Sequence, residues 1–417
     1  MASEVEFYYD IACPFSYLAV SAFRSIPREN PIKIQWMPIY LDSIKDRAGV
    51  GSPIVKGDCS AKKVWMERDL KMMCERYNVP INRSPRYEDQ DGTPQKLLAS
   101  IDNNGDREKL SLALFSHYWL KDCDIQDSKV LENIAKEAGL SLNVQQQIAR
   151  GEEPLKKLNE EANKLGIFRV PCFRVSRKIY FGPDRLYFVE RELGNNQASE
   201  LRLRLPSSAT PGHRAKLTFY YDFVSPWSYI AAVAIERLVE QLKPVTVDVE
   251  WVPVSLPGLI QANKAPVEAA LDAANPAFLK ATGRDMQMQI ALRGGMPFKF
   301  NSKFPYISTT TLRAILVNDA ADLRRKIFQE LWTADRDLSD DKVVAEVIEE
   351  AGYDAKDILS KAEEDNIKDQ FAQNMSRALK AGAFGVPAFQ VNDGTLIFGQ
   401  DRLNIVADML CGWNCNL

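Results

Sequence analysis

The chain has 417 residues, a formal net charge of −3 and a sequence pI near 5.8. This length allows two domains of ordinary size, each with its own hydrophobic core. The charge leaves no basic excess for a phosphate backbone, so no nucleic-acid partner is expected. No apolar run approaches the roughly 20 residues of a membrane span, so no membrane association is expected. A strand-like pattern starts almost at once, and we expect no signal or transit peptide.

The seven cysteines are irregularly spaced, which argues against a disulfide framework and favours a reducing compartment. We therefore expect a cytoplasmic protein, with a mitochondrial or peroxisomal location as the alternative. No metal site is predicted, because these cysteines stand at no metal-like spacing: Cys59, Cys74, Cys123, Cys411 and Cys415.

The first part of the chain alternates strand and helix patterns. EVEFYYD (4–10) and IKIQWMPIY (32–40) predict strands, and PFSYLAVSAFRSI (14–26) predicts a helix that begins at its proline. A long helical stretch follows. The segment 166–194, GIFRVPCFRVSRKIYFGPDRLYFVERELG, then predicts two short strands and a last helix, which Asp184 is suited to cap.

The second part of the chain repeats this order. KLTFYYD (216–222), PWSYIAAVAIERLVEQL (226–242) and VTVDVEWVPVSL (245–256) predict strand, helix and strand. After another helical stretch, 382–410 reads GAFGVPAFQVNDGTLIFGQDRLNIVADML, where Asp401 is the expected cap of the last helix.

The two parts are copies of one unit. Ser225 follows Cys13 by 212 positions, and Arg402 follows Arg185 by 217, so spacing hardly drifts. Such a long period indicates two globular domains rather than a solenoid. We expect a first domain at 1–194 with a helical insert at about 45–160, a linker at 195–216, and a second domain at 217–417 with an insert at about 258–378.

Cys13 and Ser225 each directly precede the proline that begins a helix. There, free backbone N–H groups and the positive end of the helix dipole favour an anion. A thiolate is such an anion, and helix N-termini lower the pKa of a thiol from about 8.5. The sulfur could be that of Cys13 itself, or a bound thiol cofactor to which the Ser225 hydroxyl donates a hydrogen bond. Alternatively, both residues serve only as a cap and a buried small side chain.

Four segments carry a resemblance to a known family: FYYDFVSPWSYIA, Asn263 in QANKAP, GAFGVPAF and FGQDRLNIV. In this order they resemble kappa-class glutathione transferases and 2-hydroxychromene-2-carboxylate isomerases, over nearly all of 216–412 and more loosely over 4–194. The resemblance implies an α/β fold class: two tandem thioredoxin-like domains, each with an all-α insertion. It also implies glutathione as the cofactor, with a hydrophobic or aromatic electrophile as the second substrate.

The resemblance assigns roles in the second copy. Ser225 matches the serine that activates the glutathione sulfur. Val386 precedes Pro387, the expected cis proline, and its backbone is expected to pair with the cysteinyl part of glutathione. The γ-glutamyl end is expected at Asp401 and Arg402, and Asn263 is expected near the reacting centre.

The first copy departs from the family pattern. Cys13 replaces the serine, and RAGVGSP (47–53) stands where the second copy has QANKAP. Val170, Pro171, Asp184 and Arg185 keep the glutathione-shaped frame. Cys172 follows the expected cis proline, so a Cys13–Cys172 disulfide and a mixed disulfide of Cys13 with glutathione are alternatives to a copy that is only structural.

Family members of this kind are usually homodimers, so the resemblance implies an intramolecular pseudo-dimer of the two halves. The leading hypothesis is a glutathione-dependent transferase or isomerase that works at Ser225. The alternatives are a thiol-disulfide oxidoreductase centred on Cys13, which predicts a low Cys13 pKa, and a non-catalytic thioredoxin-like interaction module. Candidates to hold the electrophile, which fit a core equally well, are Trp251, Met296, Phe304 and Tyr306.

Overall fold

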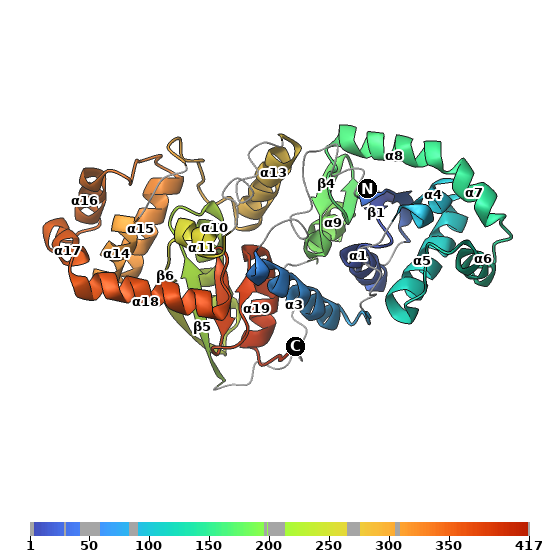
Figure 1. The fold of residues 1–417 in the computed structure, drawn as a ribbon. Helices are drawn as coiled ribbons and strands as arrows, with labels where there is room; N and C mark the ends of the chain where they lie inside the picture. Colours follow the sequence, from blue (N-terminus) through green and yellow to red (C-terminus); the bar gives the residue numbers. More distant parts are fainter. Residues whose placement is uncertain are drawn as a thin grey trace.

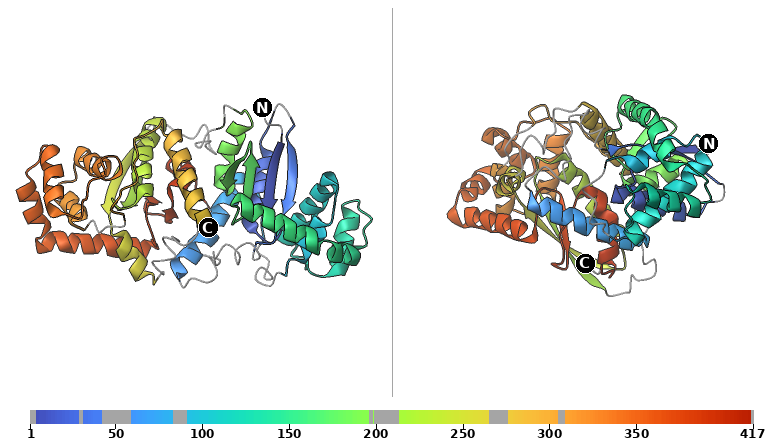
Figure 2. Two further views of the ribbon diagram at one scale, coloured as in Figure 1. Left: turned by 90° about the horizontal axis from the view of Figure 1, so that it is seen from above. Right: turned by 45° about the vertical axis from the view of Figure 1, so that its right-hand side comes forward.

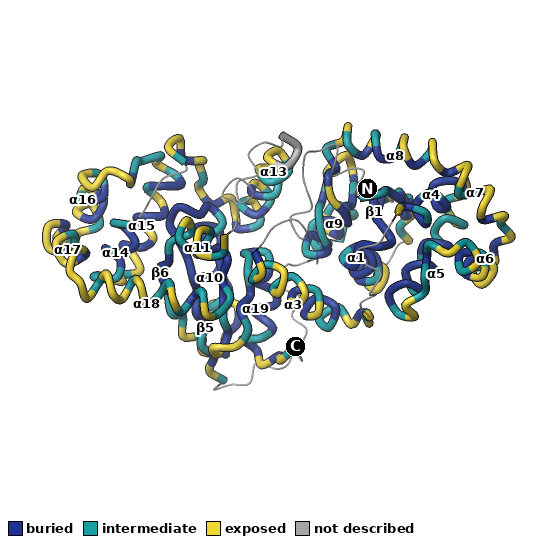
Figure 3. The backbone as a smooth tube through the Cα atoms, viewed as in Figure 1, coloured by how far each residue is buried: buried dark blue, intermediate teal, exposed yellow. Residues whose placement is uncertain are grey.

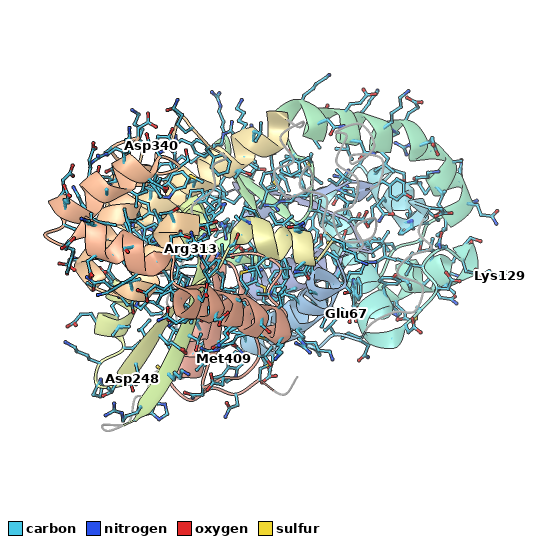
Figure 4. All side chains as sticks on the ribbon, turned by 60° about the vertical axis from the view of Figure 1, so that its left-hand side comes forward. Glu67, Lys129, Asp248, Arg313, Asp340 and Met409 are labelled. Atoms are coloured by element: carbon cyan, nitrogen blue, oxygen red, sulfur yellow. The ribbon has the colours of Figure 1, made fainter. Side chains whose placement is uncertain are left out.

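The computed structural model describes residues 4–28, 31–41, 59–82, 91–195, 198, 213–264, 276–304 and 309–415. Two halves lie side by side, with the first half on the right and the second on the left of Figure 1. Lys129 marks the outer end of the first half, and Arg313 and Asp340 mark the helical part of the second (Figure 4).

Within its described residues, the first half places six helices between its second and third strands. In chain order its elements are β1 (Glu4–Tyr9), α1 (Pro14–Ser25), β2 (Lys33–Pro38), α3 (Ser60–Tyr77), α4 (Thr93–Ala99), α5 (Asn104–Lys121), α6 (Ser128–Glu137), α7 (Val144–Arg150), α8 (Glu152–Leu165), β3 (Cys172–Val175), β4 (Lys178–Phe181), the 3₁₀ turn η1 (Pro183–Arg185) and α9 (Leu186–Glu192).

The second half has the same plan. Its elements are β5 (Arg214–Tyr221), α10 (Pro226–Gln241), β6 (Thr246–Pro253), α11 (Leu256–Ala262), α13 (Pro276–Leu292), α14 (Thr309–Val317), α15 (Ala321–Trp332), α16 (Asp341–Glu350), α17 (Ala355–Ala362), α18 (Asp365–Ala381), β7 (Ala388–Val391), β8 (Ile397–Phe398), η2 (Gln400–Arg402) and α19 (Leu403–Leu410). β5 begins at Arg214, which lies inside the segment predicted as a linker.

Each half contains a four-stranded sheet, in the orders β2-β1-β3-β4 and β6-β5-β7-β8. The first pair of strands in each sheet is parallel and the other pairs are antiparallel. Phe7 stands between Trp36 and Phe173 in one sheet, as Phe219 stands between Trp251 and Phe389 in the other. The predicted fold class, two thioredoxin-like units with all-α insertions, is confirmed.

Aromatic side chains of the central strands form the core of each half, and the strands are mostly buried in Figure 3. Phe7 stacks on Phe173 with ring centroids 4.9 Å apart, and Phe219 stacks on Phe389 at 5.3 Å. Their burial accounts for the tight packing of β1 and β5 in the middle of the sheets.

One tryptophan in each insert anchors the helices to the sheet unit. Trp119 Nε1 donates to the Ile11 carbonyl and Trp332 Nε1 donates to the Phe223 carbonyl, both at 2.9 Å. Because a buried indole N–H needs an acceptor, this bond fixes α5 and α15 against the turns that lead into α1 and α10. α1 and α10 begin at Pro14 and Pro226, as predicted.

The predicted caps of the last helices are wrong. α9 and α19 follow η1 and η2 directly, so Arg185 and Arg402 occupy the N-cap positions and no side chain caps either helix. The carboxylates fold back instead: Asp184 Oδ1 and Asp401 Oδ1 lie so close to Gly182 and Gly399 that a Cβ there would clash with them. Both glycines have positive φ, which leaves this space open.

Helices of the two halves pack against each other across the boundary. α3 of the first half lies against α19 of the second (Figures 1 and 2), where Arg76 Nε donates to Asp408 Oδ2 at 2.7 Å. Trp65 of α3 packs against the rings of Phe384 and Phe398, with centroids 5.6 and 5.4 Å away. The loop before Pro387 is therefore in part covered by the other half.

Candidate active site

Ser225 occupies the N-cap of α10, at the end of the turn that follows β5. Its Oγ accepts a hydrogen bond from the Ser228 N–H at 3.2 Å and donates to the Val386 carbonyl at 3.4 Å. The Val386–Pro387 peptide bond is cis, as expected. The structure thus brings together Ser225, Val386 and Pro387, which lie about 160 residues apart in the chain.

The backbone beside Ser225 fits a bound peptide. Val386 is 5% exposed, and among the described residues no hydrogen-bond acceptor is found for its N–H. A buried backbone donor without a partner is uncommon in folded proteins. A peptide that runs alongside this segment, as one strand adds to another, would supply the missing acceptor.

A residue that the sequence analysis missed holds this turn in place. Asp222 accepts hydrogen bonds from the Val224 N–H at 3.1 Å and from the Leu256 N–H at 2.7 Å. In the first half, Asp10 does the same for the N–H groups of Ala12 and Leu41. The signal was present, since this aspartate belongs to the repeated Tyr-Asp of both copies.

Cys13 takes the corresponding position at the N-terminus of α1. Its Sγ lies 3.8 Å from the Val170 carbonyl, and Val170–Pro171 is also a cis peptide bond. Burial raises the pKa of the Cys13 thiol and outweighs the hydrogen bonds from Ser16, which lower it. This direction is opposite to the low pKa that the oxidoreductase hypothesis requires.

Cys13 and Cys172 are both free thiols, so the structure contains no disulfide between them. The two belong to one buried apolar cluster, and burial raises the pKa of the Cys172 thiol as well. The segment 47–53, which stands in the place of QANKAP, lies outside the described residues.

Asn263 ends α11 rather than facing Ser225. Its Nδ2 donates to the Leu259 carbonyl at 2.9 Å and to the Ala383 carbonyl at 3.0 Å. Since Ala383 lies just before the Pro387 loop, Asn263 helps to position that loop. No contact of Asn263 with Ser225 is found in the described part of the chain.

Arg402 is paired with the other half of the molecule. Its guanidinium forms two bonds to Asp69 of α3, Nε to Oδ1 at 2.7 Å and Nη2 to Oδ2 at 2.8 Å, while Nη1 lies 3.0 Å from Asp184 Oδ2. Arg402 therefore forms a buried ion pair between the two halves. The resemblance had placed this arginine at the γ-glutamyl end of glutathione instead.

Arg185 mirrors this arrangement. It forms two bonds of 2.6 Å to Asp285 of α13, which belongs to the second half, and also contacts Asp184 and Asp401. Asp285 follows Asp69 by 216 positions, in the same register as the repeated prolines. Equivalent residues thus meet across the boundary in both directions.

The two aspartates at the centre of this cluster differ in their titration. Burial opposes ionisation of Asp184, but Arg185 and Arg402 hold the pKa of this carboxyl well below its usual range. Burial, together with the Asp184 carboxylate, raises the pKa of Asp401 to about 6 despite the neighbouring Arg402. The pKa values of the two carboxyl groups are thus shifted in opposite directions.

None of the described residues that were expected to hold the electrophile lines a pocket with Ser225. Trp251 and Met296 line one pocket of the second half, whereas Phe304 packs against Phe300 and Trp332. Tyr306 lies outside the described residues.

Within the described ranges, no helix is both long and apolar enough to cross a membrane. In the same ranges no three His, Cys, Asp or Glu side chains are grouped as metal ligands.

Two thioredoxin folds, each with a helix N-terminus facing a cis proline, define a tandem thioredoxin-fold protein. The chain belongs to the DSBA-like thioredoxin domain family, whose model matches residues 4–194 and again 216–410.

Named relatives each match about half of the chain. A 2-hydroxychromene-2-carboxylate isomerase from Sphingobium xenophagum is 28% identical over 196 residues, 46% of this chain and 99% of the relative. Glutathione S-transferase kappa 1 from Caenorhabditis elegans is 25% identical over 206 residues, 47% of this chain and 90% of that protein.

Two solved structures resemble about half of the chain. A 2-hydroxychromene-2-carboxylate isomerase structure covers 47% of this chain and 94% of its own, with a TM-score of 0.40 and 21% identity. A probable DsbA oxidoreductase from Streptomyces coelicolor covers 49% of this chain and 92% of its own, with a TM-score of 0.40 and 17% identity.

Proposed function

We propose that the second half binds glutathione and ionises its thiol beside Ser225, for attack on an electrophilic small molecule. The position of Ser225 supports this proposal, because Ser225 lies at the N-terminus of α10 and faces the carbonyl of Val386. The kappa-class transferases and isomerases among the relatives support glutathione as the thiol.

The chemistry needs a stable thiolate at neutral pH. The Ser225 O–H exchanges the Val386 carbonyl for the glutathione sulfur and donates a charge-assisted hydrogen bond to it. The N-terminus of α10 favours the same negative charge. The Val386 N–H donates a hydrogen bond to a backbone carbonyl of the tripeptide, and the Asp401 carboxylate accepts one from its γ-glutamyl amino group.

Two reactions use this sulfur. In a transfer, the thiolate forms a C–S bond with the electrophilic carbon, and that carbon's leaving group departs with the bonding electrons or the adduct takes up a proton. In an isomerisation, the thiolate adds to a double bond, the resulting single bond rotates, and the thiolate is expelled again. Both require the same thiolate at Ser225.

In this proposal the first half supports the site of the second half structurally. Asp69 holds Arg402 and Trp65 covers the loop before Pro387, as a second subunit would in a homodimer of such units. The burial of Cys13 and the raised pKa of its thiol disfavour the oxidoreductase alternative.

A calorimetric titration with glutathione tests the proposal. Wild type should bind about one glutathione per chain, and Ser225→Ala should weaken binding and abolish the thiolate. Ser255→Ala is the matched control, because Ser255 caps α11 by accepting a 3.1 Å hydrogen bond from the Gly258 N–H. Each of the two variants should lose about 1 kcal/mol of helix capping. Equal loss of glutathione binding in both variants would mean that Ser225 serves only as a helix cap, and it would overturn the proposal.

A further inference from the structure

A pocket of about 360 Å³ lies in the second half between α10, α15 and the turn that follows α13. This volume falls within the range of small-molecule sites. The pocket starts at Tyr229, one turn into α10, and its walls include neither Ser225 nor Val386 nor Asp401. It is therefore separate from the proposed thiol site.

One wall of the pocket is aromatic and apolar. Tyr229 stacks on Phe328 with ring centroids 5.6 Å apart, and Trp251 and the buried Met296 complete the surface. Such a wall suits a flat apolar body, because rings gain both area burial and specific ring contacts.

The rest of the pocket is cationic. Arg237, Arg293, Arg324 and Arg325 line it, against the single carboxylate of Glu236. The lining thus carries an excess of positive charge beside a largely apolar wall, where the field of each guanidinium is screened less than in open water.

Among these arginines, Arg237 is available to a ligand. Arg325 is paired with Glu236 at 3.1 Å, and Arg324 donates to the Asp319 carbonyl at 2.8 Å. Arg237 is exposed and has no hydrogen bond or ion pair within the described parts of the chain. Its guanidinium lies over Gly294, where an added Cβ would come within 3.4 Å of Nη2.

The first half provides an internal comparison. The equivalent bonds of Trp119 and Trp332 align α5 with α15 at an offset of 213, and Pro14 and Pro226 align α1 with α10 at 212. By this alignment Arg237, Arg324 and Arg325 correspond to Ser25, Ser111 and Leu112. The three charges therefore belong to the second half alone.

The exchange of Ser111 for Arg324 has a structural cost. In the first half, the Tyr9 hydroxyl and the Ser111 hydroxyl share a hydrogen bond of 2.5 Å. The equivalent Tyr221 hydroxyl is buried and has no hydrogen-bond partner in the described residues. An unsatisfied buried hydroxyl is destabilising. Arg324 itself pairs with Asp319 and lies over the Trp251 ring, 4.6 Å from its centroid.

We propose that this pocket binds an organic anion with a flat apolar body, such as an arylcarboxylate. The carboxylate pairs with the Arg237 guanidinium, and the ring lies against Trp251 and Phe328. This site is independent of glutathione binding at Ser225.

Calorimetric titration with naphthoate, in the absence of glutathione, tests the proposal. Wild type should bind naphthoate, and Arg237→Gln should weaken binding by about fivefold, as expected for loss of one partly exposed charge pair. Arg177→Gln, which removes another exposed arginine, is the control and should bind as wild type does. The neutral naphthalenemethanol should bind more weakly than naphthoate.

A second variant tests the location. Val233 lines the pocket and is half-buried, so Val233→Trp should fill the cavity and abolish naphthoate binding. Ser225→Ala should leave naphthoate binding unchanged although it weakens glutathione binding. Equal affinities of wild type and Arg237→Gln, full binding in Val233→Trp, or tighter binding of the neutral analogue would each overturn the proposal.

Discussion

Asp69 of the first half and Arg402 of the second form a two-pronged ion pair, with N–O distances of 2.7 and 2.8 Å. The Asp69 side chain is 1% exposed, so the pair is almost completely removed from water. Arg402 ends the η2 turn that also carries Asp401, and its position therefore depends on the other half of the chain. This pair couples the geometry of the proposed thiol site to the first half.

Replacing Asp69 should destabilise the protein strongly. Asp69→Asn leaves the Arg402 guanidinium buried without its bidentate partner, and breaking such a pair costs about 3 kcal/mol. Urea unfolding followed by tryptophan fluorescence measures this loss. Asp285→Asn is the matched control, since Asp285 holds Arg185 in the same way but is 23% exposed. A loss in Asp69→Asn no greater than in Asp285→Asn would contradict the account.

Asp401 should make stability depend on pH. Its pKa of about 6 in the folded protein is above the unfolded value of about 3.9, so its favourable contribution is complete below the unfolded value and is lost as pH rises through 6. Asp401→Asn should therefore be more stable than wild type at pH 8, by about 2 kcal/mol, and this advantage should disappear near pH 4.

Asp184→Asn should change the pH dependence of stability in the opposite direction. The pKa of Asp184 is lowered, so its contribution is present above the unfolded pKa and is lost as pH falls. This variant should be less stable than wild type at pH 8. Thermal unfolding of the three proteins across this pH range, without glutathione, measures both effects. A pH-independent difference for Asp401→Asn would show that Asp401 does not titrate in this way.

Gly399 should not tolerate a side chain. Gly399→Ala brings a Cβ into steric clash with Asp401 Oδ1 and also strains a φ of +98°. Gly352→Ala carries only the backbone strain, at a φ of +89° with open space around it. We expect a loss of about 1 kcal/mol at Gly352 and at least about 2 kcal/mol at Gly399, measured by urea unfolding. Equal losses would mean that the carboxylate moves away without cost.

Cys13 should react slowly in the folded protein. It is 8% exposed and burial raises the pKa of its thiol, whereas Cys123 is partly exposed. Brief alkylation with iodoacetamide at pH 7, read by mass spectrometry, should therefore label Cys123 before Cys13. Faster labelling of Cys13 would restore the thiol-disulfide hypothesis for the first half.

The fold was predictable because its signals are local or repeated. Strand alternation, the prolines that begin α1 and α10, and the doubled Val-Pro motif all recur in order along the chain. The cis state of Pro171 and Pro387 was also expected, from the family resemblance.

The partners of Arg402 and Arg185 were not predicted, because the ion pairs join residues 333 and 100 positions apart. No periodicity within one element reports such a contact. Asp69 and Asp285 do share the offset of the repeated prolines, so a comparison of charged residues between the copies could have singled them out. The helix caps were wrong for the same reason, since Asp184 is drawn to arginines of both halves.

If Ser225 stabilises a thiolate, the pKa of glutathione bound to the protein must be lowered by its hydroxyl. Ultraviolet thiolate absorbance, followed through a pH titration of the complex, should give a pKa below 7 in wild type and in Cys13→Ser. In Ser225→Ala the pKa should return toward the value of a free thiol, about 8.5. A low pKa that persists in Ser225→Ala, or is lost only in Cys13→Ser, would contradict the account.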